Sequence, residues 1–201
     1  MNQRVFMTMA TVVLLASTLF AGEGIMMSVT TPPCYWADSH LEEILGIDLS
    51  TITNIPVIWL DTTDSLRPTG DPQATFADLT AYGRRHGGRY LVEVIIDRID
   101  LEKRKKTVVP FLVFRYRVFA VITGTLRIID VEEDNLLNIR ALQFELQASE
   151  KVQLIDDDED HPALLLPADA RMRLLRRLDE RAAGELCMEI RRLTRGTYFG
   201  G

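Results

Sequence analysis

A chain of 201 residues is long enough for one domain and a targeting segment, and a hydrophobic fraction of 47% argues against wholesale disorder. The net charge of −6 argues against a nucleic-acid-binding protein, which would favour a basic surface. Two cysteines are too few for a disulfide framework or a metal centre. We expect Cys34 and Cys187 not to meet, with a disulfide between them as the alternative.

The N-terminal segment has the features of an export signal. Met1–Arg4 carries one positive charge, and Val5–Ala21 follows without a charged residue and leads into small residues. This order is typical of a secretory signal peptide. Glu23 interrupts the apolar run, whereas a spanning helix needs about 20 apolar residues, although an anchor continuing through Ile25–Val29 is the alternative. We therefore predict residues 1–24 to be a signal peptide or an N-terminal membrane anchor.

The next part of the chain is expected to lead into a single α/β domain. Residues 25–54 are expected to be a linker with a short helix at Leu41–Leu45, because Val29–Ser39 is irregular and contains prolines and threonines. The apolar run Ile55–Leu60 predicts a buried strand. Asp71-Pro72 predicts the start of a helix, because aspartate suits the N-cap and proline the first helical position. Gly87-Gly88 is expected to end that helix.

Three β segments follow, each with apolar and polar residues in alternation. They are Tyr90–Asp100, Phe111–Asp130 and Leu142–Ala148. The middle segment is longer than a usual strand, so we expect a bend or bulge at Gly124. Three consecutive strands of this kind predict an antiparallel meander.

Charged turns are expected at Glu102–Lys106 and Glu132–Asn135, and a long amphipathic helix from Pro167 to Arg195. The order predicts an α/β (α+β) fold with a mixed, mostly antiparallel four-stranded sheet. Two amphipathic helices, including the long C-terminal one, are expected to cover the sheet. We assign the domain to residues 55–196 and a tail to residues 197–201.

Parts of this pattern resemble a group of bacterial envelope proteins. Ala77–Val92 is similar to the helix, glycine and strand start of that group, and Leu126–Asp130 to a strand end before a turn. Ala168–Leu193 is similar to its final helix in place and character. The group includes the curli secretion protein CsgG, the penicillin-binding-protein activator LpoB, the N-terminal domain of TolB and auxiliary lipoproteins of envelope ABC transporters. The resemblance, over about residues 55–195, implies an exported domain that binds or helps assemble envelope machinery without chemistry of its own.

The sequence carries no recognisable catalytic, cofactor or metal motif. His40, His86 and His161 do not have metal-ligand spacing, and nucleophile-elbow, Walker and dinucleotide fingerprints are missing. The acidic run Asp156–Asp160 lacks the spacing and glycine of a calcium loop, so we interpret it as a solvated loop and leave cation binding open. We predict no enzymatic activity, no cofactor and no resident metal.

One basic run is a candidate interaction site. Four adjacent cations are expected at a hairpin tip beside the apolar stretch Val108–Phe114, where they could contact an acidic partner or lipid headgroups. The alternative is an exposed turn that only favours solubility. The four are Lys103, Arg104, Lys105 and Lys106.

We therefore predict an exported, non-catalytic protein of the periplasm or envelope membranes that binds or helps assemble another envelope component. Two alternatives stay open: an outer-membrane secretion or channel subunit like CsgG, and a hydrolase whose site follows no motif. The expected partner is an unidentified envelope protein. Membrane association through the N-terminus and homo-oligomerisation also stay open.

Overall fold

The computed structural model describes residues 24–34, 38–53, 55–60, 74–109, 113–148 and 166–196. Within them, five strands form one mixed sheet in the order β2-β1-β3-β4-β5. Strand β1 runs parallel to both β2 and β3, whereas β3, β4 and β5 form an antiparallel meander. The strands are β1 (Ile25–Thr30), β2 (Val57–Trp59), β3 (Tyr90–Val109), β4 (Val113–Asp130) and β5 (Asn135–Gln147).

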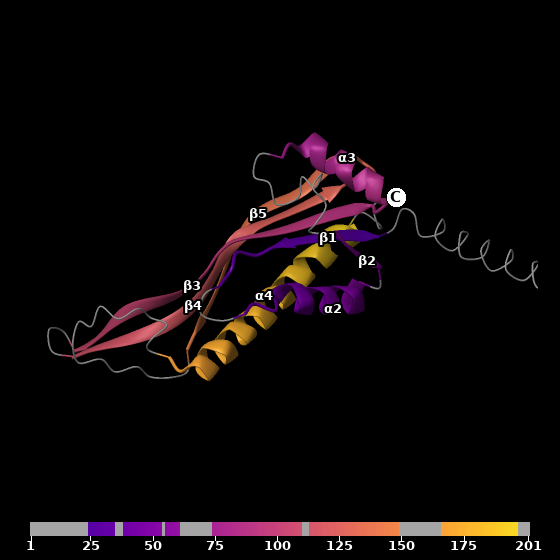
Figure 1. The fold of residues 1–201 in the computed structure, drawn as a ribbon. Helices are drawn as coiled ribbons and strands as arrows, with labels where there is room; N and C mark the ends of the chain where they lie inside the picture. The colour runs from indigo at the N-terminus through magenta and orange to yellow at the C-terminus, as the bar shows by residue number, and fades with distance from the viewer. Residues whose placement is uncertain are drawn as a thin grey trace, which may run out of the picture.

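Three described helices cover the two faces of the sheet (Figure 1). One face carries α2 (Leu41–Thr53) and the long α4 (Ala168–Gly196), which also pack on each other. The other face carries α3 (Phe76–His86). The larger core lies under α2 and α4, and a smaller cluster of seven buried residues lies under α3. None of the described helices is long and apolar enough to cross a membrane.

The expectation of four strands and two helices is wrong, because residues 25–54 are not a linker. They form β1, which lies between β2 and β3, and the 13-residue helix α2. The first five residues of β1 are buried, as expected for a strand covered on both faces, and such a strand lacks apolar/polar alternation. Since Ile25–Val29 is part of the sheet, an anchor that continues through these residues is also excluded.

Helix α3 begins later than its sequence predicts. Thr75 is the N-cap, and a capping box joins it to Asp78: the Thr75 hydroxyl accepts from the Asp78 N–H at 3.3 Å, and the Asp78 carboxylate accepts from the Thr75 N–H at 3.1 Å. The predicted start at Asp71-Pro72 lies outside the described residues. The predicted stop is confirmed, since Gly87 takes the left-handed conformation with φ 74°.

The predicted meander is confirmed, but β3 and β5 are longer than expected. Glu102–Lys106 is not a turn, because β3 continues to Val109 and these residues pair with β4. The irregularity predicted at Gly124 lies opposite this glycine on the neighbouring strand: the register shifts between Ile96 and Arg98, where β3 has one extra residue.

Candidate functional site

The β3–β4 hairpin extends beyond the rest of the sheet (Figure 1). Pairing between β4 and β5 ends at Phe119, whereas β3 and β4 stay paired as far as Val109 and Val113. We call residues 103–118, the part of the hairpin beyond Phe119, the arm. The arm therefore consists of two strands without a third strand beside them in the described part of the chain.

The arm concentrates positive charge. It has six lysine and arginine residues and no acidic residue, so the rest of the chain carries a formal charge of −12 against −6 for the whole. The pairing register places Arg104 directly opposite Arg117 and Lys106 opposite Arg115. Like charges directly opposite each other destabilise a two-stranded pair. The arm is therefore not optimised for stability alone.

Part of this repulsion is relieved by acidic neighbours at the base of the arm. The Arg104 guanidinium pairs with the carboxylates of Glu102 at 2.8 Å and Glu145 at 2.9 Å, and these contacts raise the pKa of Arg104. The same group lies 4.4 Å from the centre of the Phe119 ring. Arg104 is thus held by the protein itself, whereas Lys105 and Arg117 are exposed, and Arg117 donates a hydrogen bond to the Gln147 side-chain oxygen at 2.9 Å.

The predicted basic run is correctly located on this hairpin, but it does not lie at the tip. Lys103–Lys106 occupy successive positions of β3, and successive positions of a strand alternate between the two faces. The four cations therefore do not form one cluster on one face. Sequence reasoning missed Arg115 and Arg117, which the register brings opposite this run.

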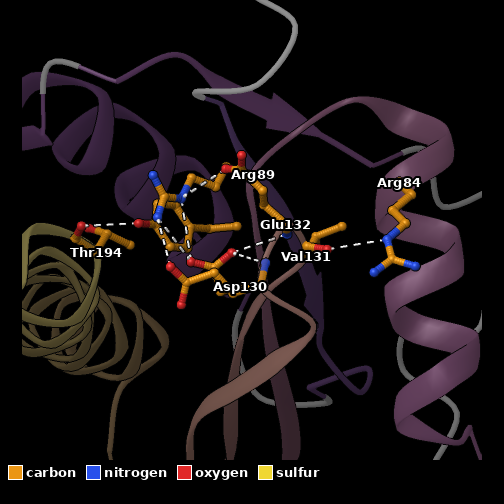
Figure 2. Close-up of polar contacts among 8 residues, drawn as sticks. Arg84, Arg89, Asp130, Val131, Glu132 and Thr194 are labelled. Atoms are coloured by element: carbon orange, nitrogen blue, oxygen red, sulfur yellow. Dashed lines mark hydrogen bonds and ion pairs between the residues drawn. The ribbon is translucent and has the colours of Figure 1, made fainter. Parts of the chain in front are cut away.

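A second polar cluster lies where β4 turns into β5 (Figure 2). The buried carboxylate of Asp130 accepts hydrogen bonds from the backbone N–H groups of Glu132 and Glu133, both at 3.1 Å, and from the Arg89 guanidinium at 3.3 Å. Arg84 of α3 donates to the Val131 carbonyl at 3.3 Å. These groups satisfy one another and fix the turn and α3, so we assign the cluster a structural role.

An open groove lies between α2 and the edge strand β2. Its volume is about 690 Å³. Acidic residues of α2 and apolar residues of both elements line it, among them Glu42, Glu43, Gly46, Ile47, Val57 and Trp59. The sequence analysis did not identify this groove, because it expected residues 25–54 to be a linker.

Asp179 of α4 is fully buried against the start of α2. Its carboxylate accepts hydrogen bonds from the His40 N–H at 2.8 Å and from the Ser39 hydroxyl at 3.3 Å. Burial raises the pKa of Asp179 to about 6, although these hydrogen bonds lower it. Asp179 therefore caps α2 from a different helix and joins the two helices by a titratable contact.

This raised pKa predicts that Asp179 makes the protein less stable as the pH rises from about 4 to about 6. The folded state holds the proton more tightly than the unfolded state, where the pKa is 3.8, so the stabilisation is complete below pH 3.8 and lost by about pH 6. Two pKa units correspond to about 3 kcal/mol. The asparagine of Asp179→Asn cannot ionise. We therefore expect the free energy of unfolding of this variant, minus that of wild type, to be about 3 kcal/mol larger at pH 7 than at pH 4. Urea unfolding of both proteins measures this, and an equal difference at the two pH values would contradict it.

The remaining titratable candidates have local partners. His40 lies 3.7 Å from the Glu43 carboxylate, and the His86 ring lies 4.4 Å from the Tyr82 ring. Cys34 and Cys187 are free thiols, and burial raises the pKa of Cys187 to about 12. No group of three or more metal-ligating side chains occurs in the described part of the chain. His161 and the acidic run Asp156–Asp160 lie outside it.

Comparison with known proteins finds distant structural neighbours only. No protein-family model and no curated protein matches the chain. The hypothetical protein CT253 from Chlamydia trachomatis is 12% identical over 87% of this chain and 98% of that chain, with a TM-score of 0.45. A minor lipoprotein from Acinetobacter baumannii is 13% identical over 84% and 92%, with a TM-score of 0.40. TolB from the same organism is 15% identical over 60% and 23%, with a TM-score of 0.30.

These neighbours include bacterial lipoproteins and the envelope protein TolB. Structural similarity at these low identities and TM-scores assigns neither a family nor an activity to the chain. The finer resemblance to CsgG and LpoB stays a prediction from the sequence.

Proposed function

We propose that this protein is an exported, non-catalytic component of the bacterial envelope that binds or helps assemble another envelope component through its arm. The uncharged apolar segment Val5–Ala21, after a basic start, supports export. The folded part begins by Ile25, directly after that segment, so cleavage or anchoring upstream of β1 would leave the sheet complete.

The observation that carries the proposal is the charge of the arm. The arm, which extends beyond the rest of the sheet (Figure 1), has six cationic residues and no acidic one, whereas the rest of the chain has a negative net charge, and the pairing register sets two pairs of these cations opposite each other. An arrangement that costs stability in the free protein gains from an anionic surface on a partner, because that surface neutralises the repulsion. The expected partner is therefore an envelope component with an acidic contact surface.

Reversing charges on the arm should weaken binding to the envelope. We expect the triple variant Lys103→Glu, Lys105→Glu, Arg117→Glu to associate at least about tenfold less with washed envelope membranes, since each surface ion pair contributes up to about 1 kcal/mol. The matched control reverses three exposed arginines away from the arm and makes the same change in net charge: Arg140→Glu, Arg177→Glu and Arg191→Glu. Co-sedimentation at increasing salt concentration, with a C-terminal tag for detection, measures the association.

Equal loss of membrane association in the arm variant and in the control would show a general charge effect and contradict a role for the arm.

The same fractions test export through the intact mass of the product. A shortened product in the periplasmic fraction, or a full-length product in the membranes, agrees with export. A full-length cytosolic product would overturn the proposal.

A further inference from the structure

The groove between α2 and β2 lies at an open edge of the sheet. Strand β2 is the last strand on its side and pairs with β1 alone among the described strands. The hydrogen bonds at its two ends join the Pro56 carbonyl and the Leu60 N–H to β1. Backbone groups alternate between the two sides of a parallel strand, so those of Val57 and Trp59 face outward. The outer edge of β2 can therefore accept a further strand.

An aromatic side chain forms one wall of the groove. The Trp59 ring lies directly on the backbone of α2 at Gly46, where an added Cβ would come 2.4 Å from ring carbon Cζ2. Gly46 thus provides the space that Trp59 occupies and fixes the place of the ring. Trp59 stays 41% exposed and Ile47 of α2 61% exposed, which makes them two of the large apolar side chains open to solvent. An aromatic face of this kind attracts cations as well as apolar groups.

The same region is uniformly acidic. Residues 24–60 contain no lysine or arginine, whereas they contain four acidic residues. Two of these, Glu42 and Glu43, line the groove, and both are exposed. The His40 side chain lies 3.7 Å from the Glu43 carboxylate. The groove therefore combines an aromatic ring, carboxylates and a strand edge with no further strand beside it among the described residues.

We propose that this groove binds a basic, extended segment of a partner protein, which adds to the edge of β2 as a sixth strand. The main chain of the segment bonds to Val57 and Trp59, and every second side chain points toward α2. Cationic side chains at those positions reach Glu42 and Glu43 and lie against Trp59. This site is independent of the arm, since it requires a partner of the opposite charge.

The test is a titration of the full chain with short synthetic peptides. The chain has two tryptophans, and Trp36→Phe removes the one that does not belong to the groove lining described above, so the fluorescence reports Trp59 alone. We expect saturable binding of a peptide with alternating lysine and valine, and none of the matching glutamate–valine peptide. Methylation of alternate backbone nitrogens in the lysine peptide should abolish binding, because it blocks strand pairing while the charge is unchanged. Glu42→Gln/Glu43→Gln should weaken binding about tenfold.

The matched control Glu180→Gln/Glu185→Gln removes two exposed carboxylates from α4 and should bind like wild type. Circular dichroism of each variant establishes that it is folded. Three results would overturn the proposal: equal binding of the two charge-opposed peptides, full binding of the methylated peptide, or equal loss in the groove variant and its control. A fourth result would also overturn the proposal. If the chain self-associates as its concentration rises and the lysine peptide disrupts this association, the groove binds a second copy of this chain.

Discussion

Replacing Gly124 with alanine is expected to lower the free energy of unfolding by about 3 kcal/mol. Gly124 is buried in β4, and an added Cβ would come 2.3 Å from the Ile95 carbonyl oxygen and 3.0 Å from the Ile96 Cα. Both atoms belong to the backbone of β3, so no side-chain rotation can make room. The register shift on β3 lies at this point, which means that the close approach of the two strands depends on a residue without a side chain.

Urea unfolding monitored by circular dichroism measures this effect, and the chain contains a suitable control. Gly184 lies within α4, and an added Cβ there would meet nothing within 4 Å. Gly184→Ala should therefore raise the free energy of unfolding by about 0.5–1 kcal/mol, because alanine loses less conformational freedom in a helix. Equal effects of the two substitutions would show that β3 moves away from Gly124 at little cost.

The parts of the fold that the sequence predicts well are those with one buried face. Apolar and polar residues alternate along much of β4 and the second half of β5, and α4 has an apolar stripe, so local pattern and burial agree. Strand β1 offers no such pattern, since both faces are covered and its apolar residues closely follow those of the export segment. Its assignment depends on pairing with Val57–Trp59 and Tyr90–Ile95, which are distant in the sequence.

The extent of the arm could not be predicted for a related reason. Lys103–Lys106 has the composition of a turn, and only the opposing segment of β4 makes it a strand. Strand propensity depends on cross-strand neighbours more than on the residue itself. The groove required a contact between Gly46 and Trp59 that no local pattern indicates. One signal was present in the sequence, namely the lack of lysine and arginine from residue 24 to residue 60.

Replacing Arg127 with methionine is expected to lower the free energy of unfolding by about 3 kcal/mol. Arg127 of β4 lies opposite Glu93 of β3, and Arg127 Nε is 3.0 Å from Glu93 Oε2. This contact is an ion pair without hydrogen-bond geometry between the two atoms. The Glu93 side chain is 1% exposed, so loss of the guanidinium leaves a carboxylate in a site from which water is excluded.

A double-mutant cycle separates this penalty from the value of the pair. Glu93→Leu/Arg127→Met removes both charges, and we expect it to lie within about 1 kcal/mol of wild type, because a buried pair gains little over apolar groups of similar volume. Arg98→Met is the control: its ion pair with Glu102 at 3.0 Å is partly exposed, so the change should stay within about 0.5 kcal/mol. Thermal and urea unfolding of wild type, Glu93→Leu, Arg127→Met and the double variant measure the coupling, and Arg98→Met is measured alongside them.

The result of this double-mutant cycle indicates why the ion pair between Glu93 and Arg127 is present. If Arg127→Met costs less than about 1 kcal/mol, the charge of Glu93 is compensated by its other contacts, and the coupling argument fails. If Arg127→Met is strongly destabilised and the double variant is not, the ion pair contributes little to net stability. Its effect is then to disfavour other registers between β3 and β4. A slip of one residue between β3 and β4 would place Glu93 and Arg127 on opposite faces of the sheet, so that they could no longer pair. The buried pair would then select the register on which the bulge opposite Gly124 and the facing cations of the arm depend.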